Sequence, residues 1–371
     1  MKYLAFYDVT ENKEENRNYV LAATNKMKYI LECVEDLHIP CKVISASTTN
    51  GKKIYKSKKI QISDNVQLIL PFTLGKANKI IAILDRWQIK IRLLLELLKT
   101  KKSETVIVYH SLYYMPLVAL AKKIKKFRLI LEVEEIYGDV IEKENTSKKE
   151  LEFFKKADAY IFPTELLDKK VNTENKPSVI IYGTYGVEKE IGAKANDNKI
   201  HVVYAGTLDP RKGGITAVKT AEFLNSGYHI HILGFGNDRD KEILLQEIDR
   251  VKKLSDCEVS FDGLLTGEEY TKFIQSCDIG LCPQNPDAKF TNTSFPSKTL
   301  SYMSNGLRVV SIKIPSMEQS KIGEYLYFYN EQAPETIAET IKKIDLKDNY
   351  DSRSVISRLD REFREKIKQL L

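Results

Sequence analysis

In the first half of the chain, short apolar runs alternate with longer segments whose apolar residues recur every three or four positions. Apolar runs of about four to eight residues predict buried strands, and the 3.6-residue period predicts amphipathic helices. We therefore expect helices over residues 20–37, 77–99, 116–125, 148–156 and 165–171. The expected strands cover residues 3–7, 41–45, 53–62, 66–70, 105–109, 128–133, 159–162 and 179–182.

A segment rich in Gly, Ala, Lys, Asn and Asp, residues 187–198, interrupts this alternation and predicts a linker. Beyond it the pattern predicts strands over 200–204, 229–233, 258–261, 279–282 and 309–312, and helices over 215–224, 241–253, 267–274, 298–304 and 352–371. Alternating strands and helices are typical of a parallel sheet with helices on both faces. We expect two α/β domains of similar size, which bind ligands at the carboxyl ends of their strands, in a cleft where the domains face each other.

The composition agrees with two domains, because 371 residues are too many for one ordinary core. No apolar run is long enough to cross a bilayer, and the N-terminal stretch turns polar too early for a secretory signal. The five cysteines are scattered without a C-x-x-C pair. This usage favours a reducing compartment, hence the cytoplasm, and disfavours structural zinc.

The positive charge is concentrated in residues 51–130, where 15 Lys and 3 Arg stand against 2 Asp and 2 Glu, a net charge of +14. Such a segment attracts a polyanion or an anionic membrane surface, although a solvated Lys-rich face is the simpler alternative. A nucleic-acid partner is disfavoured, since no recognisable reading motif is present and the aromatic residues do not interleave with the Lys runs.

The segment KFTNTSFPSKTLSYMSNGLRVVS, residues 289–311, predicts a polar loop followed by a short helix and a buried strand. Ser297 and Lys298 fall in the first turn of the helix, and Asn305-Gly306 ends it. The loop brings hydroxyls, free N–H groups and one ammonium to a helix N-terminus, which suits phosphate. The alternative is a well-capped core helix whose Lys298 faces solvent.

A second phosphate-binding candidate is the sequence AGTLDPRKGG, residues 205–214, between a predicted strand and a predicted helix. Its glycines permit close approach of the backbone, and Arg211 and Lys212 neutralise charge. Gly234-Phe235-Gly236 follows the next strand and is a weak signal alone. The first strand–helix loop of the chain, residues 8–18, has no glycine, which counts against an NAD-binding domain.

These segments together resemble the glycosyltransferases that have the two-domain GT-B fold and use nucleotide-sugar donors. The similar segments are YAGTLDPRKGG (204–214), ILGFG (232–236), VSFDGLL (259–265), SCDIGLCP (276–283), FPSK (295–298) and YMSNGLRVV (302–310). The last two are similar to the group 1, or family 4, enzymes of bacterial capsule and surface-polysaccharide synthesis. The resemblance is specific over roughly residues 200–345, which is about the size of one domain.

The resemblance implies two Rossmann-like domains: 1–186, which binds the acceptor, and 187–350, which binds the nucleotide sugar. It also implies that a C-terminal helix, 351–371, packs back on the N-terminal domain. The donor contacts that it implies are Gly206, Thr207, Arg211, Lys212, Gly234, Gly236, Gly263, Leu264, Thr293, Ser294, Phe295, Pro296, Ser297, Lys298 and Ser301.

The chain departs from the family at three of these positions. Thr293 and Ser301 replace two glutamates that in many retaining members hold the donor sugar and the ribose. Thr207 replaces an arginine, and Lys298 is placed to compensate for the lost charge. The donor sugar and the retaining or inverting course therefore stay open.

Candidate catalytic residues come from two strand ends of the N-terminal domain. His110 follows the strand over 105–109, where related enzymes often carry a histidine near the donor sugar and acceptor; a surface histidine is an equal alternative. Glu134 and Glu135 follow the next strand, and a carboxylate there suits a general base for an acceptor hydroxyl. Solvated surface glutamates are the slightly favoured alternative.

Two apparent metal motifs are interpreted structurally. Asp238-Arg239-Asp240 spells the D-x-D motif of another glycosyltransferase fold, but it opens a predicted helix, where acidic residues are expected. His229 and His231 share one face of a strand, and we expect them to be packed or surface residues rather than ligands. We therefore predict no bound metal and no cofactor, the nucleotide sugar being a co-substrate.

The predicted function is metal-independent transfer of a hexosyl or related group from a UDP- or GDP-sugar to a lipid-linked glycan acceptor, in surface-polysaccharide or glycoconjugate synthesis. The alternative is a non-catalytic, nucleotide-sugar-binding partner of a glycosyltransferase complex. The basic amphipathic helix 77–102 and the run 122–126 predict peripheral, salt-reversible binding to the inner face of the cell membrane.

Overall fold

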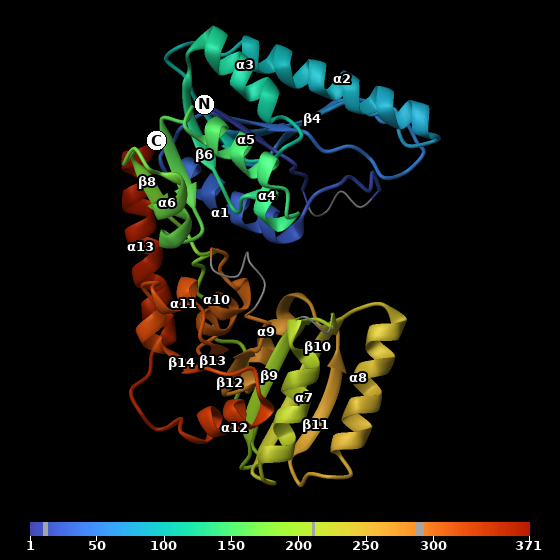
Figure 1. Cartoon of the computed structure of the whole chain (residues 1–371), viewed down its shortest axis with the longest axis vertical. Coiled ribbons are helices and arrows are strands. Elements are labelled where there is room, and N and C mark those ends of the chain that lie inside the picture. Colours follow the sequence, from blue (N-terminus) through green and yellow to red (C-terminus); the bar gives the residue numbers. More distant parts are fainter. Residues whose placement is uncertain (10–13, 210–211, 287–292) are drawn as a thin grey trace. The chain divides into compact units, whose positions relative to one another are not determined.

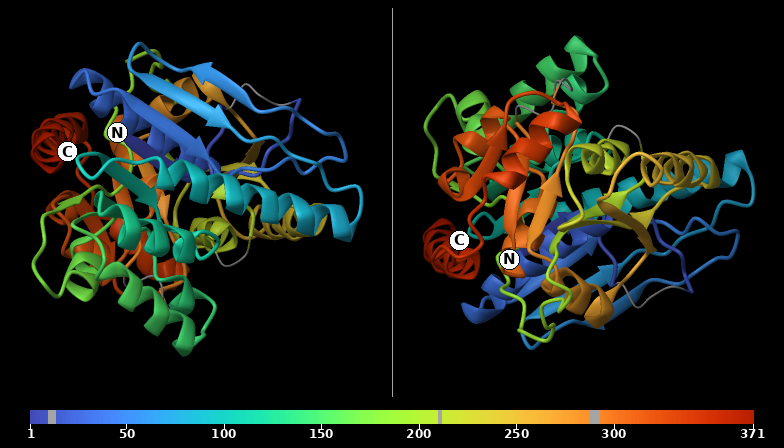
Figure 2. Two further views of the ribbon diagram at one scale, coloured as in Figure 1. Left: turned by 90° about the horizontal axis from the view of Figure 1, so that it is seen from above. Right: turned by 90° about the horizontal axis from the view of Figure 1, so that it is seen from below.

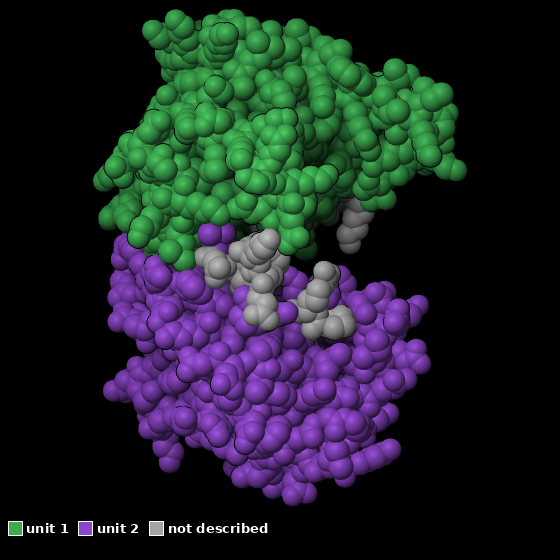
Figure 3. Space-filling model, viewed as in Figure 1, with its two compact units in different colours: residues 1–184, 363–371 green, residues 185–362 purple. Residues whose placement is uncertain are grey.

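The computed structural model describes residues 1–9, 14–209, 212–286 and 293–371, and its chain divides into two compact units. Unit 1 comprises residues 1–184 together with 363–371, and unit 2 comprises residues 185–362 (Figure 3). Each unit contains one sheet with helices packed on it (Figures 1 and 2). The predicted pair of α/β domains is thereby confirmed.

Unit 1 has an eight-stranded sheet in the order β3-β4-β2-β1-β5-β6-β7-β8, which is parallel except for β3. Its strands are β1 (Lys2–Ala5), β2 (Cys41–Ser45), β3 (Lys58–Gln61), β4 (Val66–Leu70), β5 (Thr105–Tyr109), β6 (Arg128–Glu132), β7 (Ala159–Phe162) and β8 (Ser178–Ile180). Its helices are α1 (Leu21–Asp36), α2 (Lys79–Leu98), α3 (Met115–Lys125), α4 (Tyr137–Val140), α5 (Glu144–Phe154) and α6 (Glu165–Val171).

Unit 2 has a six-stranded parallel sheet in the order β11-β10-β9-β12-β13-β14. Its strands are β9 (Ile200–Thr207), β10 (Tyr228–Phe235), β11 (Glu258–Gly263), β12 (Ile279–Cys282), β13 (Arg308–Ile312) and β14 (Leu326–Tyr329). Its helices are α7 (Gly214–Thr220), α8 (Asp238–Val251), α9 (Gly267–Ser276), α10 (Ser297–Ser304), α11 (Pro315–Glu318) and α12 (Pro334–Lys342), with the 3₁₀ turns η2 (Ala221–Phe223) and η4 (Gly323–Tyr325).

The strands are apolar along most of their length because helices cover both faces of a parallel sheet. In unit 1 the core includes Leu4 of β1, Val108 of β5, Leu131 of β6 and Phe154 of α5, each at most 1% exposed. The expected strand over 53–62 is only half formed, since β3 begins at Lys58. The preceding residues make an isolated bridge, Tyr55 to Thr73, instead of a ladder.

The last helix, α13 (Ser352–Leu370), contributes to both units, because its final residues group with unit 1. In unit 1 the Phe363 ring lies 5.6 Å from that of Tyr29, and Arg128 Nη1 donates to the carbonyl of Leu371 at 3.1 Å. In the described part of the chain, no helix combines the length and the hydropathy that crossing a membrane requires.

Both sheets have a point where the strand order reverses. β1 lies between β2 and β5, and β9 lies between β10 and β12, so the chain leaves each central strand in one direction and later returns on its other side. In open parallel sheets, ligands bind beside such switch points, at the carboxyl ends of the strands. A binding site is therefore expected among the residues that follow β9 and β12 in unit 2, and among those that follow β1 and β5 in unit 1.

Candidate functional site

The carboxyl end of β9 meets the beginning of α10, which follows β12. A Cβ atom on Gly206 would lie 2.5 Å from Nζ of Lys298, so only glycine leaves room for the lysine here. The ammonium lies 3.8 Å from the centroid of the Tyr204 ring, a cation–π contact. The Tyr204 hydroxyl donates to the carbonyl of Thr207 at 2.8 Å, which holds the ring in place. We call Gly206, Lys298 and Tyr204 the lysine corner.

The ammonium of Lys298 is half-buried and forms no ion pair with any residue that the structure describes. Its pKa is lowered to about 8, chiefly by burial; the nearby Lys212 lowers it further, and Cys282 opposes the shift. At pH 7 the ammonium is still charged. A cation held in this way, with an aromatic ring but no carboxylate beside it, is suited to an anionic ligand.

Glycines also bring the neighbouring loops close together. Gly234 has φ +147°, and a Cβ atom there would lie 1.7 Å from the Gly206 carbonyl. Gly213 has φ +87°, and its Cβ would lie 1.8 Å from the Pro283 carbonyl after β12. Lys212 is exposed directly before this turn. The ends of β9, β10 and β12 are thus packed tightly around the lysine corner.

The predicted start of the short helix is confirmed. Pro296 occupies the N-cap position of α10, so Ser297 and Lys298 lie in its first turn, and Gly306 with φ +86° follows its end. The Ser301 hydroxyl lies 3.1 Å from that of Tyr270. Thr293, Ser294 and Phe295 are half-buried before the helix.

The remaining predicted donor contacts lie at strand ends of unit 2. Thr207 ends β9 and is exposed, and Gly236 is exposed just after β10. Gly263 ends β11 with φ +77°, and Leu264 beside it is exposed. Arg211 lies outside the described residues.

In unit 1, His110 follows β5 and is buried rather than at the surface. Its Nε2 lies 2.7 Å from Oε1 of Glu150, a carboxylate that also accepts the backbone N–H groups of Tyr137 and Gly138. The ring of Phe154 packs edge-on to the imidazole, with centroids 4.7 Å apart. An ionised Glu150 can only accept, so Nε2 carries a proton, and in the neutral ring Nδ1 then presents a lone pair. Nδ1 is buried without a partner among the described residues.

Glu134 and Glu135 lie just beyond β6 and have different surroundings. Glu134 forms an ion pair with Lys26, while Glu135 has a raised pKa, chiefly through burial and then through Glu134 and Glu150. Glu132, within β6, is fully buried beside the Tyr3 hydroxyl, and burial raises its pKa to about 8. Glu132 is buried because β6 is a central strand, whereas Glu134 and Glu135 beyond its end are half-buried.

The acidic pair Asp238 and Asp240 lies in the first turn of α8. The side chain of the N-cap residue Asn237 accepts from the Asp240 N–H at 2.8 Å and donates to its carboxylate. These contacts are those of a helix start, as the sequence predicts.

Three contributors to these sites escape sequence reasoning. Tyr302 accepts the N–H of Ala205 at 2.8 Å and so anchors the end of β9 to α10, and Tyr204 supports Lys298. Glu150 holds His110 from α5. A fully buried glutamate beside Phe153 and Phe154 on an amphipathic helix is a usable signal, but its partner 40 residues away is not evident from the sequence.

Solved structures similar over nearly the whole chain share its two-unit architecture. One is described as "Trehalose-6-phosphate from E. coli bound with UDP-2-fluoro glucose" (TM-score 0.68, 11% identity, covering 100% of this chain and 98% of that one). Another is an alpha,alpha-trehalose 6-phosphate synthase from Burkholderia multivorans (0.67, 11%, 99% and 95%). A third is HepE from Anabaena in complex with UDP and glucose (0.66, 12%, 100% and 99%). No curated protein matches the sequence.

These similarities establish the fold, which is the GT-B fold that the resemblance predicted. Residues 199–345, which contain the lysine corner, match the family described as "Glycosyl transferases group 1". These residues, which form most of unit 2, therefore belong to that family. The predicted enzyme class, a glycosyltransferase, is thereby confirmed.

Proposed function

We propose that the chain transfers a hexosyl or related group from a nucleotide-diphosphate sugar to a lipid-linked glycan, in surface-polysaccharide or glycoconjugate synthesis. The observation that carries the donor assignment is the lysine corner, where a charged, half-buried ammonium lacks an anionic partner among the described residues. A diphosphate supplies the missing negative charge. Similar structures bound with UDP-2-fluoro glucose, or with UDP and glucose, support UDP, and GDP is the alternative base.

Catalysis in this proposal depends on positioning and on stabilising the charge of the leaving diphosphate. Lys298 contacts the diphosphate from the first turn of α10, where the helix dipole adds positive charge. Lys212 contributes a second, exposed cation, and Arg211 has the same role. With these groups the leaving diphosphate needs no metal ion.

The proposed roles in unit 1 follow from the environment of each side chain. His110 is held by Glu150 with its Nδ1 lone pair unused, so it can accept a hydrogen bond from a sugar hydroxyl. Glu135, whose pKa is raised by burial, is the better candidate for the base that deprotonates the acceptor. Glu134 is engaged by Lys26 and orients its neighbour rather than taking the proton.

The membrane part of the proposal rests on α2, which has two apolar stripes. One stripe packs on unit 1 and consists of Ile89, Leu93 and Leu97; Asp85, one turn earlier on the same side, is buried and accepts a hydrogen bond from the Thr73 hydroxyl. The other is 52–70% exposed and consists of Ile80, Leu84, Trp87, Ile91 and Leu95. At about 100° per residue the two stripes lie on opposite sides of the helix. Packing on the sheet accounts for the first stripe only.

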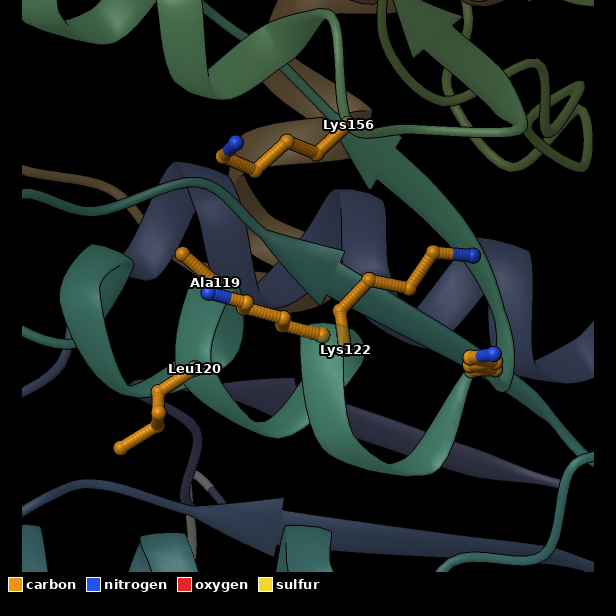
Figure 4. A pocket seen from close by; sticks show the side chains of 6 residues that line it. Ala119, Leu120, Lys122 and Lys156 are labelled. Carbon is orange, nitrogen blue, oxygen red and sulfur yellow. The ribbon is translucent and has the colours of Figure 1, made fainter.

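Cations accompany the exposed stripe. Lys90 and Arg92 fall at the two borders between the stripes, where long side chains reach lipid phosphates while the apolar residues enter the bilayer. The adjacent helix α3 adds exposed Leu120 and Ile124. It also borders a hollow of about 640 Å³ lined by Ala119, Leu120, Lys122, Lys123, Lys126 and Lys156 (Figure 4). This combination of charge and apolar surface fits an anionic bilayer.

Donor use is tested by incubating the protein with UDP- and GDP-sugars and measuring nucleotide release in the presence of a lipid-linked acceptor. Release of UDP or GDP that depends on the acceptor supports transfer. Binding of a nucleotide sugar without any turnover contradicts sugar transfer and favours the alternative of a non-catalytic binding partner.

Membrane binding is tested by sedimentation with anionic and neutral vesicles at low and high salt. We expect binding to anionic vesicles only, lost in the triple variant Arg86→Gln/Lys123→Gln/Lys126→Gln, in which all three residues are exposed. Lys122 is left intact because it pairs with Asp158. The matched control, Lys241→Gln/Lys252→Gln/Lys253→Gln, removes the same charge from exposed positions of unit 2 and should bind normally.

The apolar stripe has its own test. Trp87→Ser with Ile91→Ser changes two exposed residues, so the fold should survive while vesicle binding weakens. Equal binding to neutral and anionic vesicles, or no binding to either at low salt, contradicts the membrane proposal but leaves the donor proposal intact.

A further inference from the structure

Three of the five histidines lie together on one face of the sheet in unit 2. His201 is on β9, and His229 and His231 are on the neighbouring β10. The strand register pairs His229 with His201 on one side and with Glu258 on the other, and pairs His231 with Ser260. Partners in register point to the same face, which is normally apolar in a helix-covered parallel sheet. This polar cluster therefore requires an explanation.

The three imidazoles lie close enough to chelate one ion. A nitrogen from each ring lies within 4.8 Å of the other two, and Nδ1 of His201 is 2.9 Å from Nε2 of His231. The rings of His229 and His231 have centroids 3.8 Å apart. His201 and His231 are buried, whereas His229 is half-buried and leaves a path to solvent.

Carboxylates lie behind two of the rings. Nε2 of His201 is 2.9 Å from Asp197, and Nδ1 of His231 is 3.3 Å from Asp262, which also accepts from Ser260 at 2.9 Å. An ionised carboxylate only accepts, so these outer nitrogens carry the protons of neutral imidazoles. The two inner nitrogens then direct lone pairs at each other across 2.9 Å, which is repulsive unless a cation lies between them.

We propose that His201, His229 and His231 bind one divalent transition-metal ion of the zinc class. Imidazole nitrogens suit Zn²⁺, Ni²⁺ and Cu²⁺ and do not suit Mg²⁺ or Ca²⁺. Carboxylates that fix the tautomer and orientation of ligating histidines are the usual surroundings of such ions. The fourth coordination position lies toward solvent on the His229 side.

The competing occupant is a proton shared between His201 and His231. A shared proton would remove only the repulsion between the lone pairs of His201 and His231, and it would place a positive charge beside the ring of His229. The ring of His229 lies beside both of these rings, with centroids 5.5 Å from His201 and 3.8 Å from His231. A metal ion uses all three rings.

The site is separate from the lysine corner. His201 lies near the amino end of β9, five residues before Gly206, which is about 16 Å along a strand. The ion would therefore join β9, β10 and their flanking segments and stabilise unit 2, with no part in the transfer reaction.

The test uses full-length protein without a histidine tag, stripped with EDTA and then dialysed. Titration with ZnCl₂ should show one ion bound per chain and should raise Tm by about 5–10 °C when zinc is in large excess over Kd. Cobalt(II), used as a spectroscopic probe, should give the visible absorption of a four-coordinate site. Absence of both stoichiometric zinc binding and the cobalt spectrum in the wild-type protein overturns the proposal in favour of the shared proton.

Substitutions of single histidines test which residues bind the ion. His229→Gln and His231→Gln should each lower zinc affinity at least about 100-fold and abolish the cobalt spectrum. His38→Asn is the matched control, because His38 is exposed in unit 1, where asparagine tolerates its φ of +53°. Unchanged zinc binding in a folded His229→Gln variant, or its loss in the control, contradicts this assignment. If a variant does not fold, the wild-type measurements still decide.

Discussion

The two ends of strand β9 carry opposite kinds of polar cluster. At the carboxyl end Gly206 makes room for Lys298, a cation with an aromatic ring but no carboxylate partner in the described part of the chain. At the amino end His201 belongs to a group of bases supported by Asp197 and Asp262. The first arrangement lacks an anion, and the second lacks a cation.

This comparison shows how the chemistry of a ligand can be inferred from what a cluster leaves unsatisfied. Burial makes an uncompensated charge, or two facing lone pairs, costly in the free protein, and a ligand of the right sign removes that cost. The two clusters also differ in position, because only the carboxyl end lies at the switch point of the sheet. We therefore expect a substrate at one end and a structural ion at the other.

The largest expected effect is that of Lys298→Met. Removing a charge-assisted contact should weaken UDP or GDP binding about 10–100-fold, and turnover at saturating donor should fall by about 100-fold. Binding of the nucleoside should not change. Tm should hold or rise slightly, since a partly buried, unpaired charge is removed. Calorimetric titration with the diphosphate and with the nucleoside measures both affinities. Equal diphosphate affinity in the variant and in the parent protein would show that Lys298 does not bind the phosphates.

Gly206→Ala tests the space in the corner rather than the charge. The new methyl group would lie 2.5 Å from Nζ of Lys298, a flexible side chain that can move away, so the protein should fold. The displaced ammonium should lower diphosphate affinity about tenfold with a change in Tm of at most about 2 °C.

Gly234→Ala is the contrasting variant for this position. Its methyl group meets the Gly206 carbonyl at 1.7 Å, and φ is +147°, so here the backbone itself must move. A fall in Tm of more than about 5 °C is expected. If Gly206→Ala is the less stable variant of the two, the packing of the corner is misassigned.

The change of donor affinity with pH should be smaller than the effect of Lys298→Met. Because the pKa of Lys298 is lowered to about 8, the ammonium is mostly charged at pH 7 and mostly neutral at pH 9. Diphosphate binds the charged form, so affinity should fall about tenfold or less between these values. Lys298→Arg stays charged and should flatten the profile. A flat profile in the parent protein would show that Lys298 does not titrate with the ligand.

Much of this organisation could be predicted from local sequence. The alternation of strands and helices predicts the two parallel sheets, and the segments around Gly206 and Lys298 predict both halves of the corner. Each of these signals lies within about ten residues, where turn and capping preferences act. The end of α10 at Asn305-Gly306 is an example.

The remaining features depend on contacts between distant segments. Alternation correctly places His229 and His231 on one face, but His201 joins them only through the register of β9 and β10. From the pattern of their own strand alone, His229 and His231 are predicted to be packed or exposed residues rather than metal ligands. Similarly, the apolar residues of α2 can be counted in the sequence, but only the structure separates the packed stripe from the exposed one.

The smallest effect is the one that we expect metal chelation to have on sugar transfer, the reaction assigned to the carboxyl end of β9. Chelation by EDTA should leave the rate of sugar transfer unchanged when the assay temperature is well below Tm, because Lys298 and Lys212 supply the charge that a metal would otherwise provide. If the histidine site holds zinc, the same treatment should lower Tm, so the two ends of β9 would respond independently. Transfer rate and thermal unfolding measured on one EDTA-treated sample compare them directly. Strict dependence of transfer on Mn²⁺ or Mg²⁺ would contradict the metal-independent mechanism. Asp238 and Asp240, in the first turn of α8, would then become candidate metal ligands.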